Sequence, residues 1–261
     1  CAQHPPGIPH RTVVVCNGRE PDPATDGPFK SEMWRSTRSV LETLPGVTFF
    51  LHDDAGWDIG GYIAASRHIE TDAVMCMGGS SYPTREGWLR RMADAWRKYG
   101  PGMYGTLTSY EITPHLNSTG FMCPTSDLRR YPFPVRTQFD RYAFEHGKAN
   151  ISLLTGGPEP KGRMFWRLVP DSGRAVQLVT WDGEYDWWDW RRPDNIYRSG
   201  DQSNCVTRWH YCDRYDHYEE SVKQPLRRQT DTLTDSSYDL KARSIRRAAD
   251  EIGSEPLEFG A

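Results

Sequence analysis

Short apolar runs alternate with amphipathic segments over the first hundred residues of the chain. The runs at 12–18, 47–51 and 72–77 predict buried strands, because short apolar stretches bounded by turn residues are typical of them. Apolar residues at helical spacing predict helices over 31–44 and 59–70. Strands that alternate with helices indicate an α/β protein whose right-handed crossovers build a mostly parallel central sheet flanked by helices.

The same pattern continues for one more helix and one more strand, and it becomes irregular after residue 109. Thr84 is the expected N-cap of a helix over 85–99, which has Trp88 and Met92 on its apolar face, and 103–108 is the expected strand. Beyond this point the sequence predicts an irregular half of the molecule, with strands at 120–123 and 175–181 and helical segments within 126–131, 139–154 and 200–220.

The chain contains no internal repeat and no clear linker, so we expect one domain over residues 1–220. The first ten residues, which include three prolines, predict a loose arm at the start of this domain. Residues 221–261 are charged and polar with one amphipathic segment near 240–252. They predict a C-terminal helical extension, which either docks or is partly disordered.

Acidic residues and glycines gather in the stretch from His52 to Tyr62, between an expected strand and an expected helix. In open α/β sheets the carboxyl ends of the strands are where ligands bind. The carboxylates of Asp53, Asp54 and Asp58 could accept hydrogen bonds from a ligand, and glycines allow a close approach of the backbone. The alternative is a tight turn in which Asp54 or Asp58 caps the helix.

A second glycine-rich turn, formed by Gly78, Gly79, Ser80 and Ser81, follows the next expected strand. Adjacent parallel strands would bring both turns to one crevice. Backbone N–H groups of this turn, expected at the start of a helix, could hold a phosphate, although Gly-Gly-Ser is also an ordinary loop sequence.

A third group of polar residues lies in the irregular half. It contains His115 and Asn117, followed by Arg141 and Glu145. The Glu145 carboxylate could act as a general base on an acceptor hydroxyl. The alternative is a surface Glu-His pair at the end of a helix, where Gly147 would follow as the C-cap.

Tryptophans and acids alternate between residues 181 and 192, and a Gly-Asp-Gln-Ser-Asn segment follows. This segment would suit recognition of a sugar. The face of the sugar ring would pack on Trp181 and Trp187, and the sugar hydroxyls would bond the polar groups of Asp182 and Gln202. The other interpretation is an exposed loop that binds a protein. Asp201 and His210 are weak candidates for metal ligands, because they lack tight spacing.

Composition narrows the classes of function. The 261 residues carry a formal net charge of -3, which argues against a globally basic nucleic-acid binder, although a local basic patch stays possible. Hydrophobic residues make up 37%, and 10 Trp and 13 Tyr compensate in part because each buries a large area. No apolar run is long enough to span a membrane, and the six Cys form no CxxC pair, so we expect a cytoplasmic protein without a disulfide framework.

The order of these features resembles the glycosyltransferases of the GT-A fold. The run 13–18 matches their first strand, the stretch 56–62 is similar to a turn in rhamnan-synthesis-type members, and 144–147 and 200–204 match later motifs. The resemblance implies a Rossmann-like GT-A domain. It further implies that Asn17, Asp53, Asp54, Asp58, Gly60 and the 78–81 turn bind the nucleotide. Acceptor or sugar contacts would come from His115, Asn117, Arg141, Trp181, Asp182, Trp187 and Gln202.

The sequence departs from this family at the metal motif. Gly78-Gly79-Ser80 stands where Asp-x-Asp is expected. Two alternatives follow: Mn²⁺ or Mg²⁺ is bound by other residues, with His210 a candidate, or Arg85, Lys161 and Arg163 neutralise the diphosphate without a metal.

The two candidate catalytic acids, Glu145 and Asp201, would give inverting and retaining chemistry respectively. The function implied is transfer of a sugar from a nucleotide-diphosphate-sugar donor to a hydroxyl acceptor. The acceptor would be a glycan or a hydroxymethylated base in phage-type DNA. The alternative is a non-catalytic carbohydrate-binding or scaffolding protein with a degenerate nucleotide site.

Overall fold

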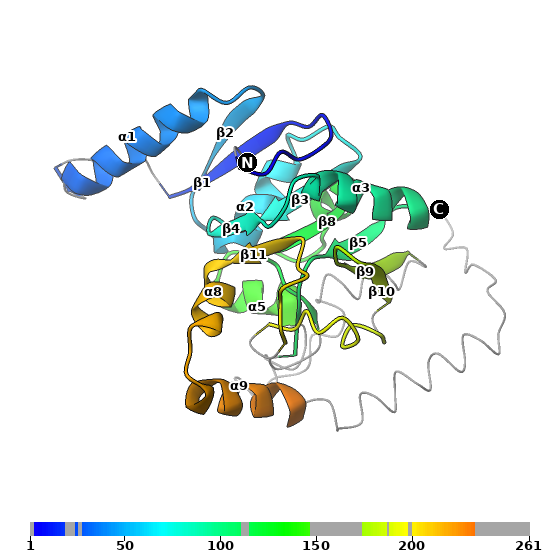
Figure 1. The fold of residues 1–261 in the computed structure, drawn as a ribbon. Helices are drawn as coiled ribbons and strands as arrows, with labels where there is room; N and C mark the ends of the chain where they lie inside the picture. The colour runs from blue at the N-terminus through cyan, green and yellow to red at the C-terminus, as the bar shows by residue number, and fades with distance from the viewer. Residues whose placement is uncertain are drawn as a thin grey trace.

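A computed structural model describes residues 3–18, 24–25, 28–110, 115–146, 174–186, 188–197 and 200–232 of the chain. Within these residues the protein is a mixed α/β structure (Figure 1). Figure 1 also shows that the first helix projects outward beside the first two strands, while the remaining elements pack around a larger sheet.

The N-terminal strands form a parallel pair. β1 (Thr12–Asn17) pairs with β2 (Val47–His52) in parallel, so that Asn17 lies opposite His52 at the carboxyl end. Helix α1 (Pro28–Glu42) makes the connection between them, and α2 (Trp57–Ser66) follows β2. The strand–helix–strand–helix order expected for this part of the chain is confirmed.

The larger sheet has five strands in the order β10-β9-β5-β8-β3. These strands are β3 (Ala73–Met77), β5 (Gly102–Gly105), β8 (Gly120–Pro124), β9 (Ala175–Val179) and β10 (Glu184–Asp186). β5 and β9 are parallel, but β8 runs antiparallel to both β3 and β5, and β10 runs antiparallel to β9. The expectation of a mostly parallel central sheet is therefore wrong for this sheet.

The reversal of β8 has a local cause. After β5 the chain forms two short strands, β6 (Thr108–Ser109) and β7 (His115–Leu116), which pair antiparallel. This pairing turns the chain back toward the sheet, so β8 enters against the direction of β5. A parallel strand would need a longer crossover connection in its place.

The segment expected to be helical over 200–220 begins as a strand instead. β11 (Thr207–Trp209) pairs antiparallel with β4 (Ser81–Pro83), and only then does α8 (His210–Asp216) begin. Helix α9 (Glu220–Thr232) is the described start of the expected C-terminal extension. The rest of that extension, from residue 233, lies outside the described residues.

Two apolar clusters lie against the five-stranded sheet. One joins Ile59 of α2 to Phe121 of β8, Leu178 of β9 and the fully buried Trp190. The other joins α3 (Trp88–Tyr99), through the expected apolar face with Trp88 and Met92, to β5 and β9. The short helices α4 (Thr125–Arg129) and α5 (Gln138–His146) complete the first cluster with Leu128 and Phe144.

The N-terminal segment is docked on α3, not loose as expected. The Pro5 carbonyl accepts a hydrogen bond from the Gly87 N–H at 2.7 Å, and the Pro6 carbonyl accepts one from Arg90 N–H at 3.0 Å. These carbonyls cap the start of α3, where free N–H groups need acceptors. Thr84 is not the N-cap, because its hydroxyl donates to the Cys205 carbonyl at 2.6 Å and Gly87 precedes the helix.

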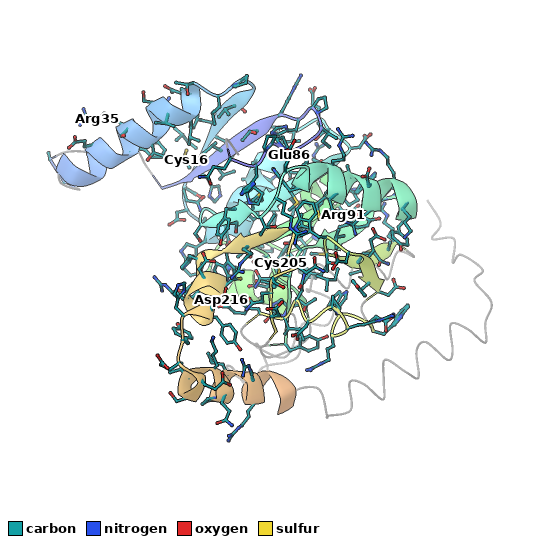
Figure 2. The ribbon with its side chains drawn as sticks, in the orientation of Figure 1. Cys16, Arg35, Glu86, Arg91, Cys205 and Asp216 are labelled. Atoms are coloured by element: carbon teal, nitrogen blue, oxygen red, sulfur yellow. The ribbon has the colours of Figure 1, made fainter. Side chains whose placement is uncertain are left out.

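The five cysteines in the described part of the chain are free and buried, which agrees with the absence of a disulfide framework among them. Cys16 lies in the β1–β2 pair and Cys205 beneath β11, well apart in Figure 2. Burial raises the pKa of the Cys205 thiol well above its ordinary value, so it stays protonated at neutral pH.

Candidate functional site

The turn between β2 and α2 has an unusual backbone. Asp54 and Trp57 have φ of 66° and 51°, and Gly56 between them has φ of 75°. Left-handed conformations of residues other than glycine cost energy and are enriched at functional sites. Asp53 is exposed, and its carboxylate accepts a hydrogen bond from the Ala55 N–H at 3.1 Å. Asp53 and Asp54 therefore lie at the surface of the molecule.

Two glycines allow α2 to approach the strands and the turn closely. A Cβ on Gly60 would lie 1.9 Å from the Ala55 carbonyl oxygen, and one on Gly61 would lie 2.7 Å from Val15 Cγ1. The same Cβ on Gly61 would lie 3.0 Å from the side-chain oxygen of Asn17. Gly60 thus has a packing reason to be glycine, and it is buried, whereas Asn17 is exposed beside α2.

The residue after this turn takes part in an ion pair that joins two helices. Asp58, in the first turn of α2, accepts hydrogen bonds from Arg141 of α5, with Nε–Oδ1 at 2.7 Å. Arg141 also lies 3.2 Å from Glu145, one turn further along α5. Glu145 is 7% exposed, so one guanidinium bridges a half-buried and a buried carboxylate. Three residues singled out from the sequence thereby meet in space.

The Glu145 carboxylate is held from its other side by Ser118. The Ser118 hydroxyl donates to Glu145 Oε1 at 2.7 Å, and the Ser118 N–H donates to the same oxygen at 3.3 Å. Asn117 accepts hydrogen bonds from the Thr119 N–H and hydroxyl at 3.0 and 2.6 Å, which fixes this segment. Ser118 was missed as a site residue, although it lies within the predicted cluster.

The glycine-rich turn belongs to the same network. The Thr119 carbonyl accepts hydrogen bonds from the Gly78 N–H at 3.1 Å and from the Ser81 hydroxyl at 2.7 Å. A continuous chain of contacts therefore connects Asp58, through Arg141, Glu145 and residues 117–119, to the 78–81 turn. Gly79 has open space where a side chain would be, with no heavy atom within 4 Å.

His210 reaches this turn from the start of α8. Its Nδ1 lies 2.6 Å from the Ser80 hydroxyl, because the β4–β11 pairing places the two segments side by side. Ser80 is exposed and His210 is half-buried. The 78–81 turn leads into β4 and not into a helix as expected, and its Gly78 and Ser81 N–H groups donate to the Thr119 and Gly78 carbonyls. The pair of Ser80 and His210 offers a hydroxyl and an imidazole to a polar ligand at this turn.

The second candidate acid lies elsewhere in the described contacts. Asp201 is exposed, its N–H donates to Asp194 at 3.0 Å, and its carboxylate accepts a hydrogen bond from Ser203. Gln202 is fully buried with φ of 56°, and His115 is buried in β7. No contact among the described residues joins Asp201 to Glu145.

The Trp-Asp segment is more structural than expected. The Trp181 Nε1–H donates to Thr84 at 2.8 Å, and its ring packs against the second apolar cluster. Asp182 accepts a hydrogen bond from Asn204 at 2.6 Å. Trp187 lies outside the described residues, and Trp188 is 37% exposed. Trp181 therefore packs into the structure, while Trp188 keeps part of its ring at the surface.

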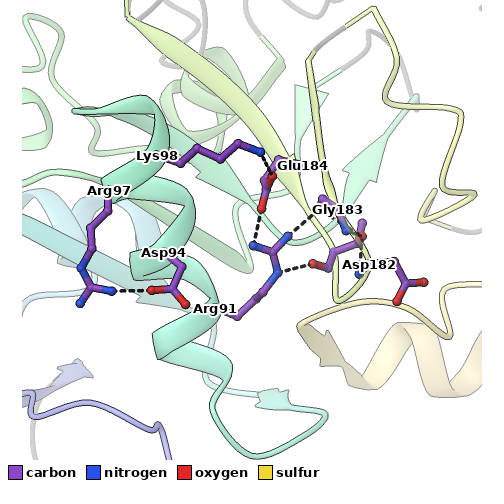
Figure 3. A network of polar contacts seen from close by, with 8 residues as sticks. Arg91, Asp94, Arg97, Lys98, Asp182, Gly183 and Glu184 are labelled. Atoms are coloured by element: carbon purple, nitrogen blue, oxygen red, sulfur yellow. Dashed lines mark hydrogen bonds and ion pairs between the residues drawn. The ribbon is translucent and has the colours of Figure 1, made fainter.

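The acid that follows Trp181 and Asp182 anchors the segment to α3. Glu184 lies 2.5 Å from Arg91 and 2.8 Å from Lys98, and Arg91 also donates to the Gly183 carbonyl at 2.8 Å (Figure 3). Burial opposes ionisation of Glu184, but the hydrogen bonds from Lys98 and Arg91 outweigh it and lower the pKa of its carboxyl. This network fixes β10 on the sheet.

Basic residues that could have formed a face for nucleic acid are largely engaged in internal contacts. Arg129 donates to the Ser66 and Ile69 carbonyls at 3.2 and 2.6 Å, and Arg97 pairs with Asp94. Arg91 and Arg141 are in the pairs described above. These contacts neutralise or fix charges that a phosphate backbone would otherwise attract.

Among the described residues, no group of three or more His, Cys, Asp or Glu side chains comes together to hold a metal ion. Lys161 and Arg163, the expected substitutes for a metal, lie outside the described residues. No described helix has the length and apolar character needed to cross a membrane.

Comparisons with known proteins give little. No family model and no curated protein matches the chain. A crystal structure of HddC from Yersinia pseudotuberculosis is 13% identical with a TM-score of 0.34, over 49% of this chain and 64% of that chain. The same protein complexed with GMP-PN gives 13% identity and a TM-score of 0.31, over 40% and 56% of the chains. Likenesses this slight carry no argument about fold family or activity.

Proposed function

We propose that the protein is a glycosyltransferase that moves a sugar from a nucleotide-diphosphate-sugar donor to a hydroxyl acceptor. The observation that supports this most is the contact network from Asp58 through Arg141 and Glu145 to Ser118 and the 78–81 turn. It joins a buried carboxylate, which can accept a proton, to an exposed glycine-rich turn where the backbone is open to close approach of a phosphate.

The proposed chemistry is a direct displacement with Glu145 as the base. Glu145 takes the proton of the acceptor hydroxyl as the acceptor oxygen bonds to the anomeric carbon. The bond between that carbon and the diphosphate oxygen breaks, and the diphosphate leaves with the electron pair. Ser118 and Arg141 orient the carboxylate through a hydrogen bond from the Ser118 hydroxyl and an ion pair with the Arg141 guanidinium.

The leaving diphosphate is assigned to the 78–81 turn and its neighbour His210. Gly79 allows close approach of a phosphate to the backbone, and Ser80 with His210 supplies further polar contacts. We assign no step to a divalent ion, and the proposed phosphate contacts come from the chain itself.

Of the two proposed acceptors, the glycan is the better supported. The pairing of Arg91 with Glu184 and of Arg141 with Asp58 leaves fewer free charges for a DNA backbone. Acceptor binding should accordingly change little between about 50 and 200 mM salt, whereas several phosphate contacts would make it fall steeply.

A thermal-shift panel tests the donor proposal. UDP-, GDP-, ADP- and dTDP-linked sugars are added to the full chain, each with Mn²⁺ and again with EDTA. We expect at least one nucleotide sugar to raise the melting temperature, since ligands that bind only the folded state stabilise it. A shift with free sugars but with no nucleotide would instead indicate the non-catalytic carbohydrate-binding protein.

A further inference from the structure

Tyr62 carries a polar atom that the fold does not satisfy. Its phenolic oxygen is excluded from solvent, and it has no hydrogen-bond partner among the described residues. A buried hydroxyl without a partner costs free energy, because the hydrogen bonds it made to water are lost. Phenylalanine would avoid this cost at the same position, so the hydroxyl calls for an explanation outside the packing of the chain.

The position of Tyr62 suggests an explanation for its hydroxyl. Tyr62 lies four residues after Asp58 on α2, and residues at this spacing are neighbours on a helix surface. Its ring packs edge-on against Phe121 of β8 at 6.3 Å, and Phe121 in turn contacts Phe144, which precedes Glu145 on α5. The Tyr62 side chain therefore lies where α2 meets β8 and α5, beside the Asp58–Arg141–Glu145 pairs.

The phenol is a hydrogen-bond donor at neutral pH. Burial, and then the negative charge of Asp58, raise the pKa of Tyr62 well above its ordinary value. The hydroxyl hence keeps its proton, whereas Asp58 and Glu145 accept hydrogen bonds. A site that combines a phenol and a guanidinium as donors with carboxylates as acceptors matches a ligand rich in hydroxyl groups, where each oxygen both donates and accepts.

We propose that the Tyr62 hydroxyl donates a hydrogen bond to an oxygen of the transferred sugar, and that Asp58 and Tyr62 form the sugar subsite of the enzyme. This inference rests on the proposed function and deepens it. It also reassigns Asp58, which was expected to bind the nucleotide, to the sugar. Tyr62 was not among the residues predicted to form the site.

The test compares two conservative variants of the full chain. Tyr62→Phe removes only the unpartnered hydroxyl, so its melting temperature should equal or exceed that of the wild type. Tyr104→Phe is the matched control, because the Tyr104 hydroxyl donates to the Gly100 carbonyl and the ring is fully buried. We expect this control to melt roughly 2–4 °C lower and to bind ligand as the wild type does.

Binding is then titrated by calorimetry with the nucleotide sugar that gives the largest thermal shift, and with the matching nucleoside diphosphate. Tyr62→Phe should weaken binding of the nucleotide sugar about tenfold, the value of one well-formed hydrogen bond. It should leave binding of the nucleoside diphosphate unchanged. Equal loss for both ligands, or no loss for either, would overturn the sugar assignment while leaving the transferase proposal intact.

A different set of ligands tests the sugar subsite if the transferase proposal itself fails. If no nucleotide sugar binds the wild type, glucose, galactose, mannose and rhamnose are tested at millimolar concentration on the same variants. A thermal shift present in the wild type and lost in Tyr62→Phe would support the sugar subsite without transferase activity. Absence of binding to every sugar would overturn both proposals.

Discussion

At the scale of single residues, Arg141 holds the candidate site together. Its guanidinium contacts Asp58 on one side and Glu145 on the other, so that one positive charge serves two carboxylates. An ionised group that is buried without a partner is costly, so loss of the arginine affects two acids at once. The site is therefore coupled to the stability of the helix pair α2 and α5.

Replacing Arg141 tests this coupling. We expect Arg141→Met to lower the free energy of unfolding by about 2–3 kcal/mol, measured by urea denaturation, because it removes the positive charge that both carboxylates contact. The exposed Arg136 lies nearby on the chain, and Arg136→Met serves as the control, with an expected change of about 0.5 kcal/mol or less. Equal effects of the two substitutions would show that the ion pairs contribute nothing.

Sequence patterns identified some of these residues and could not identify others. Asp58, Arg141 and Glu145 stand out because charged residues beside glycines, or at helical spacing, are local signals. Ser118 and Tyr62 give no such signal, since serine and tyrosine hydroxyls are common in every kind of structure. Whether a hydroxyl is paired depends on how α2, β8 and α5 pack together, and a single sequence does not encode that in any short stretch.

At the scale of elements, local patterns predicted existence better than arrangement. β1, β2, β3 and α3 were predicted because each is a run of apolar residues with its own period and its own turn signals. The direction of β8 was not, because it depends on the β6–β7 reversal that precedes it. β4 and β11 have three residues each, which is too short for a periodic signal, although their pairing brings His210 to Ser80.

The attachment of β10 to α3 has a pH signature. The pKa of Glu184 is lowered in the folded state, so its contribution to stability is complete above its ordinary value of 4.5 and is lost as the pH falls through the lowered value. We expect Glu184→Gln to cost roughly 1–3 kcal/mol at pH 7 and to differ little from the wild type near pH 2.

A control for this prediction lies on the same helix. Asp94 pairs with Arg97 on the exposed side of α3, and Asp94→Asn should cost about 0.5 kcal/mol or less at pH 7 (Figure 3). The free energy of unfolding of the wild type and of Glu184→Gln is measured between pH 7 and pH 2. A difference that stayed constant over this range would contradict the assignment.

At the scale of the whole molecule, α2 connects the β1–β2 pair to the five-stranded sheet, where its Ile59 packs with Phe121 of β8. It packs against β1 and β2 on one side and contacts α4 and α5 on the other. The ends of the parallel pair and the Asp58–Arg141–Glu145 network are thereby brought to one region, and Thr119 extends that region to the 78–81 turn. The site is assembled from segments that are distant in sequence, which is why their order along the chain indicated a function more clearly than any one motif.

The most direct test of the central claim is release of nucleoside diphosphate from the nucleotide sugar that binds best, with a glycan acceptor or water. The wild type, Glu145→Gln and Asp201→Asn are compared as folded, full-length proteins. If Glu145 is the base, Glu145→Gln should lower turnover by roughly 10²-fold or more, and Asp201→Asn should stay near the wild type. Turnover unaffected by Glu145→Gln would contradict the account.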